Sequence, residues 1–112
     1  MFGEKFATRL NSFKSKPEFF VDNVSSSLGP EWLVERAGTV KGLTDLDLNF
    51  PDHAGKNLKN IVKLVKDKGL DINGFAMRYY TNPNFKLGAF TNPDKKVRQE
   101  AIDLTKKGID AA

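Results

Sequence analysis

The sequence predicts an α/β fold, with strands at residues 6–12, 44–50 and 71–79 and helices between them at 30–40 and 54–68. Apolar and polar residues alternate in the strand segments, whereas apolar residues recur at spacings of three and four in the helical segments. A connection of helical length carries the chain back to the end of the sheet where the previous strand began. Neighbouring strands are therefore expected to run parallel.

The first strand is predicted from the alternation within residues 5–13. One face carries Phe6, Thr8 and Leu10, and the other carries Ala7, Arg9 and Asn11. A basic loop follows at 14–16, and Pro17, whose fixed φ suits a first helical turn, opens a short predicted helix over 18–26.

Residues 30–50 contain a helix and the clearest strand of the chain. Pro30 suits the first turn of a helix over 30–40, and Gly42 lies in the cap region after it. Apolar residues then alternate with polar ones over 43–50. The apolar set is Leu46, Leu48 and Phe50, and the polar set is Asp45, Asp47 and Asn49.

The polar face of this second strand is unusual. A parallel strand buried on both faces is nearly all apolar, and two aspartates cannot lie in a dry interior without partners. This face is therefore either exposed to solvent or lines a polar lumen, where Arg9 and Arg78 would pair with the two carboxylates. We predict one side for Arg9, Asp47, Asn49 and Arg78, and the helix side for Leu46, Leu48 and Phe50.

Residues 54–68 are predicted to form an amphipathic helix closed by Gly69, and residues 70–80 to contain the third strand. Four lysines of the helix share one face, which is expected to be solvated: Lys56, Lys59, Lys63 and Lys66.

A long loop follows the third strand. Its Phe85 and Phe90 are expected to pack against further strands or a neighbouring subunit. The last helix is predicted over 93–111, with Asn92 as its N-cap and Asp94 in its first turn.

Composition indicates one globular domain and excludes several kinds of site. The chain has 112 residues, of which 39% are hydrophobic and 29% charged. It has no cysteine, which excludes disulfides and thiolate metal sites. No signal peptide or membrane-spanning apolar run is recognisable, so a cytoplasmic location and no membrane partner are expected. The net charge of +4 permits nucleic-acid binding, but lysines and aromatics lie in different segments, and no nucleic-acid partner is expected.

Motifs narrow the choice further. No Gly-x-Gly-x-x-Gly turn or phosphate-cradling loop follows the first strand, which argues against a nucleotide site. No nucleophile motif or metal-binding spacing is present either. Three strand–helix units fit an open doubly wound sheet or part of a closed barrel.

A resemblance favours the barrel. Residues 80–91 read Tyr-Thr-Asn-Pro-Asn-Phe-Lys-Leu-Gly-Ala-Phe-Thr. This run resembles the xylose isomerase superfamily, which has an aromatic-Thr-His-Pro-x-Phe-Lys-x-Gly-x-Phe-Thr run followed by a helix that begins with Val-Arg, as at Val97-Arg98 here. Residues 33–37 and 42–48 look like the first helix and second strand of sugar phosphate isomerase and epimerase barrels.

The resemblance implies that residues 1–112 are the amino-terminal part of a single (β/α)8 TIM barrel, about its first three βα units. A complete barrel needs about 250 residues, and the family's chain continues into a fourth strand. The remaining strands, or a partner subunit that supplies them, are therefore expected partners, and an oligomer is expected.

The resemblance also implies a sugar site at the carboxyl ends of the strands. The implied substrate-binding residues are Asn11, Asp52, His53, Arg78 and Tyr80, and Ser12 and Tyr79 lie at the same rim. His53 is the one candidate for a catalytic role, through contact with the sugar ring oxygen, and Tyr80 matches the family's sugar-stacking aromatic. Simpler structural roles compete: His53 as a surface or helix-start residue, Asp52 as a helix cap, and the tyrosines as core residues.

The family's reaction uses a divalent metal, Mn²⁺, Mg²⁺ or Co²⁺, held by carboxylates and histidines on later strands. The resemblance thus implies a sugar isomerase or epimerase in which this chain supplies one wall of the pocket, binds no metal and is inactive alone. Two alternatives stay open. The chain resembles the barrel subunit of C-glycoside deglycosidases, and it fits a non-catalytic small subunit that completes a barrel by association.

Overall fold

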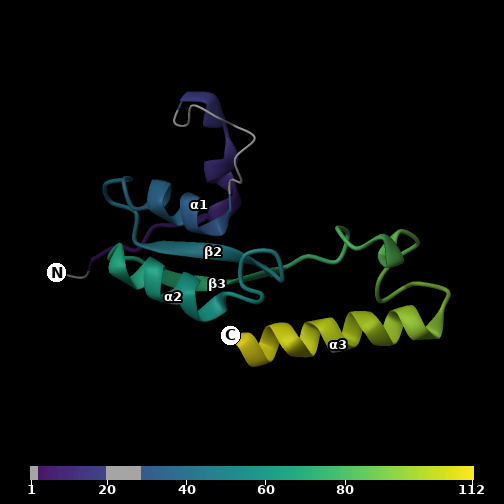
Figure 1. The fold of residues 1–112 in the computed structure, drawn as a ribbon. Helices are drawn as coiled ribbons and strands as arrows, with labels where there is room; N and C mark the ends of the chain where they lie inside the picture. The colour runs from purple at the N-terminus through teal and green to yellow at the C-terminus, as the bar shows by residue number, and fades with distance from the viewer. Residues whose placement is uncertain (1–2, 20–28) are drawn as a thin grey trace.

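A computed structural model describes residues 3–19 and 29–112, which form an open three-stranded sheet and the helices connected to it (Figure 1). The strands are β1 (Ala7–Arg9), β2 (Asp45–Phe50) and β3 (Asp71–Met77). The α-helices are α1 (Pro30–Ala37), α2 (Leu58–Asp67) and α3 (Lys95–Ala111), and short 3-10 helices are η1 (Leu10–Lys14), η2 (Pro17–Phe19) and η3 (Pro83–Phe85). Most of the helix predicted over 18–26 lies outside the described residues.

The sheet confirms the predicted α/β fold. All strand pairs are parallel, and the order β1-β2-β3 follows the chain. Helices α1 and α2 contact each other and pack on the same face of the sheet. This sequential order, with helices on one face, is shared by consecutive units of a (β/α) barrel and by one half of a doubly wound sheet.

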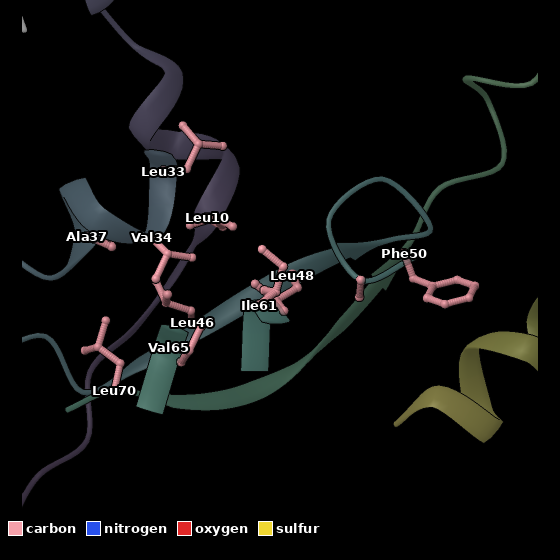
Figure 2. Close-up of a cluster of buried hydrophobic side chains, with 11 residues drawn as sticks. Leu10, Leu33, Val34, Ala37, Leu46, Leu48, Phe50, Ile61, Val65 and Leu70 are labelled. Carbon is pink, nitrogen blue, oxygen red and sulfur yellow. The ribbon is translucent and has the colours of Figure 1, made fainter. Parts of the chain in front are cut away.

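The hydrophobic core lies between that face and the two helices (Figure 2). Leu46 and Leu48 of β2 are fully buried and point toward the helices, as predicted. The helices contribute Leu33, Val34, Ala37, Ile61 and Val65. Burial of apolar surface contributes about 25 cal/mol per Å² to the free energy of folding, so this cluster stabilises the fold.

The prediction of a first strand over 6–12 was wrong in its second half. After Arg9 the chain turns into η1, and Leu10 becomes fully buried under α1. The Arg36 guanidinium donates hydrogen bonds of 2.6 and 2.7 Å to the carbonyl oxygens of Phe13 and Ser15. A helical side chain thus satisfies carbonyls that a longer strand would have paired within the sheet.

The predicted helix boundaries were too wide. Helix α1 ends at Ala37, and Val40, at the end of the helix predicted over 30–40, is exposed outside it. Helix α2 begins only at Leu58, because the residues after β2 form a turn in which the amides of His53 and Ala54 both donate to the carbonyl of Asn49.

The start of α3 also differs from the prediction. Asp94, not Asn92, is the N-cap, and its carboxylate accepts a hydrogen bond of 2.8 Å from the Lys96 amide. The Asn92 side chain is buried and bridges the Gly88 carbonyl and the Asp94 amide. Asn92 therefore fixes the loop that leads into the helix.

A β-bulge in β3 keeps its apolar residues in phase with β2. Ile72 pairs with Leu46 and Phe75 with Leu48, although Ile72 and Phe75 are three positions apart and would lie on opposite faces of a regular strand. The register shifts between Leu46 and Asp47, so that Asn73 is the additional residue. A bulge of this kind lets two residues oppose one, and both Ile72 and Phe75 stay on the helix side.

Helix α3 reaches back so that its C-terminal end lies near β3 (Figure 1). Gly108 allows this approach, because a Cβ there would lie 2.5 Å from the sulfur of Met77. The long loop has its own aromatic cluster, with Phe85 and Phe90 edge-on to Tyr79. Phe85 is buried within the chain, which corrects its prediction as an outward-packing residue, while Phe90 is half exposed.

Candidate binding site at the carboxyl ends of the strands

The face of the sheet opposite the helices is polar. A guanidinium nitrogen of Arg9 donates to the side-chain oxygen of Asn49 at 3.1 Å, and the Asn73 amide donates to Asp47 at 2.8 Å. These contacts confirm that Arg9, Asp47 and Asn49 share one side. The expected pairing of arginines with the aspartates was wrong: Arg9 bonds to Asn49, and one carboxylate oxygen of Asp45 is buried with no hydrogen-bond partner among the described residues.

Arg78 belongs to the same side. It follows Met77, whose sulfur lies against α3 on the helix side, so the pleat directs Arg78 the other way. Its amide donates to the Phe50 carbonyl at 2.8 Å, which extends the pairing of β3 with β2 beyond Met77. Its Nε is buried and has no hydrogen-bond partner in the described part of the chain.

His53 lies in the turn after β2 and is buried, at 5% exposure. Its Nδ1 accepts a hydrogen bond of 3.0 Å from the Asn49 amide. Nδ1 therefore carries no proton, and the neutral ring holds its proton on Nε2. Nε2 is buried without a hydrogen-bond partner among the described residues, which leaves one donor available to a ligand. The prediction of His53 as a surface residue, the simpler alternative, was wrong.

The electrostatic surroundings keep this ring neutral. Burial lowers the pKa of His53 below its ordinary value, and the positive charges of Lys14, Arg78 and Arg9 lower it further. The Asp52 carboxylate opposes them by raising the pKa, but it does not outweigh them. His53 is thus close enough to sense charges at the ends of all three strands.

Asp52 neither caps a helix nor hydrogen-bonds to His53 among the described residues. It is exposed, and the residue at the N-cap of α2 is Asn57, so Asp52 caps no helix. The backbone of Asn49, rather than the Asp52 carboxylate, orients the imidazole. Asp52 and His53 both line a hollow of about 410 Å³ that extends to Pro30 and Glu31 at the start of α1.

The two tyrosines have different environments. The Tyr79 hydroxyl is 2.5 Å from that of Thr105, and its ring contacts two phenylalanines, so Tyr79 is a structural residue. Tyr80 is 71% exposed, and the Arg78 guanidinium lies 5.1 Å from the centre of its ring. Of the two tyrosines, Tyr80 is therefore the one whose ring is exposed to solvent.

Asn11 lies half-buried in η1, directly after β1, and Ser12 beside it is exposed. Among the described residues, no hydrogen bond is found between Asn11 and His53, Arg78 or Tyr80. The charges that act on the pKa of His53 are those of Lys14, Arg78 and Arg9, which lower it, and that of Asp52, which raises it. Reasoning from sequence missed Lys14, although its place just after the first strand was a usable signal.

No group of three or more histidine, cysteine, aspartate or glutamate side chains within residues 3–19 and 29–112 is arranged to hold a metal ion. In those same ranges, no helix is long and apolar enough to cross a membrane. No protein-family model matches the sequence, and no curated protein matches it either. The resemblance to sugar isomerases therefore rests on the residues quoted for it.

Proposed function

We propose that this chain forms one wall of a carbohydrate-binding pocket in a sugar isomerase- or epimerase-like barrel. The supporting observation is the polar face of the sheet near the carboxyl ends of the parallel strands. There the Arg9 side chain donates to the Asn49 side chain, and His53, in the turn after β2, accepts a hydrogen bond from the Asn49 backbone amide. Ligand sites of (β/α) barrels lie at this end of the strands. Two buried donors with no hydrogen-bond partner among the described residues, on His53 and Arg78, indicate a place for ligand oxygens.

The roles follow from the geometry. His53 would donate a hydrogen bond from Nε2 to a sugar oxygen, because its Nδ1 is already occupied. In this tautomer it does not act as a base at Nε2. Tyr80 would pack its exposed ring against the apolar C–H face of the sugar, beside Arg78. Proton abstraction next to the sugar carbonyl would use a divalent metal bound by further strands.

The test is saturation-transfer NMR with the full 112-residue chain and a panel of aldoses and ketoses. We expect saturation transfer at millimolar sugar concentration, most of it lost in Tyr80→Ala and reduced in His53→Gln. Lys59→Gln, on the exposed face of α2, is the matched control and should bind like the parent chain. The absence of transfer from every sugar, or equal transfer from all variants, would refute the proposal.

A second candidate is a non-catalytic subunit that completes a barrel by association. It is favoured by the two outer strands, since β1 and β3 each pair on one side only within the described sheet. Unpaired strand edges promote association. Light scattering over a concentration series should give a mass above that of the monomer. A cooperative thermal transition with monomer mass throughout would contradict this candidate.

A further inference from the structure

We propose that Asn73 is a site of spontaneous modification, at which the side-chain amide is lost by cyclisation onto the backbone nitrogen of Gly74. The products are aspartate and isoaspartate at the bulge of β3. This inference is independent of the proposed carbohydrate site. It follows from the pair Asn73-Gly74, from the exposure of Asn73 and from its place in the β-bulge.

Gly74 makes the reaction possible on steric grounds. The backbone nitrogen after an asparagine must reach the side-chain carbonyl carbon, Cγ, and a side chain on that following residue obstructs the approach. Gly74 has none, and nothing lies within 4 Å of the position that a Cβ would take. The other asparagines of the 112-residue chain are all followed by larger residues or by proline. Asn73 is therefore the asparagine of this sequence best suited to cyclise.

Asn73 is also accessible and lies outside the regular strand pairing. Ile72 and Gly74 pair with consecutive residues of β2, so Asn73 between them has no partner on that strand. A bulge leaves its additional residue unpaired and disrupts the ladder locally. Strand pairing therefore does not hold the Asn73 backbone in place. Asn73 is exposed, and the one hydrogen bond found for its side chain among the described residues is the donation to Asp47 at 2.8 Å.

The reaction balances with water as its one co-reactant. The Gly74 nitrogen gives its proton to solvent and forms a bond to Cγ of Asn73. The bond from Cγ to Nδ2 breaks, and the amide nitrogen takes a proton from solvent and leaves as ammonia. Water then opens the cyclic succinimide. Opening at Cγ gives aspartate, whereas opening at the main-chain carbonyl of residue 73 gives isoaspartate, in which the main chain runs through the former side chain and gains a methylene.

Both products would disturb the bulge. Aspartate would place a carboxylate where the amide now donates to Asp47, so that like charges replace a hydrogen bond. Isoaspartate would lengthen the backbone between Ile72 and Phe75, whose pairing with β2 on the helix side depends on their spacing across the bulge. We therefore expect the modified chain to be less stable than the parent chain.

The experiment follows the full chain at mildly alkaline pH over days, with samples digested and analysed by mass spectrometry. We expect the peptide that contains Asn73 to gain the mass difference between a hydroxyl and an amino group, and to separate into two chromatographic forms. The loss at Asn73 should be at least tenfold faster than at Asn84, which is exposed but followed by Phe85. Equal rates at the two asparagines would overturn the inference, and so would loss that begins only after unfolding in urea.

Variants separate the chemistry from its consequence. Gly74→Ala should slow the loss at Asn73 at least tenfold and leave the urea midpoint unchanged, because there is room for the added Cβ. Asn73→Asp should lower the urea midpoint more than Asn73→Ala, since only aspartate adds a charge facing Asp47. An unchanged rate of loss in Gly74→Ala would overturn the proposed cyclisation. Equal midpoints for Asn73→Asp and Asn73→Ala would overturn the expected loss of stability.

Discussion

The two faces of the sheet are organised by different interactions. The helix-covered face is held by burial of leucine, isoleucine and valine side chains, and Leu46 and Leu48 are inaccessible to solvent. The open face is held by single hydrogen bonds, such as Arg9 to Asn49 and Asn73 to Asp47. Burial fixes the register and stability of the fold, while the open face keeps donors and charges available. Strand β2 therefore contributes apolar side chains to the core on one side and polar side chains to the open face on the other.

The sharpest test of this division is truncation on each side of β2. Leu48→Ala removes buried methyl groups and should lower the free energy of unfolding by about 3 kcal/mol. Asp47→Ala on the open face should change it by no more than about 0.5 kcal/mol. Urea titrations followed by circular dichroism measure both. Similar losses for the two variants would mean that the open face is as important for stability as the core.

A second test concerns the approach of α3 to the covered face. Gly108→Leu would place a side chain where even a Cβ meets the Met77 sulfur at 2.5 Å and a Phe50 ring carbon at 3.4 Å. We expect destabilisation of about 1–3 kcal/mol from overpacking. Gly74→Ala is the control, since nothing lies within 4 Å of its added Cβ. An unchanged midpoint for Gly108→Leu would show that α3 contributes little to the fold.

A smaller effect is expected from pH on the open face. The pKa of His53 is lowered from 6.5 in the folded chain, so the unfolded chain binds the proton more readily. The free energy of unfolding is then highest above pH 6.5. It falls as the pH drops from 6.5 toward the pKa of His53 in the folded chain, by at most about 1.4 kcal/mol per pH unit. His53 is the single histidine, so His53→Gln should flatten the dependence in urea titrations between pH 7 and 5. An equal slope in the variant would assign the effect to other groups.

The sequence predicted the fold well because its signals were local. The alternation at Asp45–Phe50 determined which side chains face the helices, and the spacing of the helical segments predicted parallel strands. The bulge at Asn73 was also detectable, since Ile72 and Phe75 cannot share a face of a regular strand. Boundaries were less accurate where tertiary contacts decided them, as with Leu10, which leaves the strand to enter the core.

The candidate site was predicted less well because its connections are not local. His53 was selected by the resemblance and its place just after the second strand, and Arg78 by its place on the third predicted strand. The sequence did not indicate that the Asn49 backbone amide, rather than Asp52, would orient the imidazole. It also did not indicate that Arg9 would hydrogen-bond to Asn49 rather than to an aspartate. Those choices depend on the distances between side chains on neighbouring strands and in the turn after β2.

The most direct test of the division between the faces is a ¹H–¹⁵N NMR map of the chain during titration with the sugar that gives the strongest saturation transfer. We expect the shifted amides to cluster at Arg9, Asn49, His53 and Arg78, at the carboxyl end of the open face. Amides on the covered side should stay in place, including those near Trp32, which borders a separate hollow of about 600 Å³ beside α1. Shifts confined to the surroundings of Trp32, or spread evenly over both faces, would contradict the account.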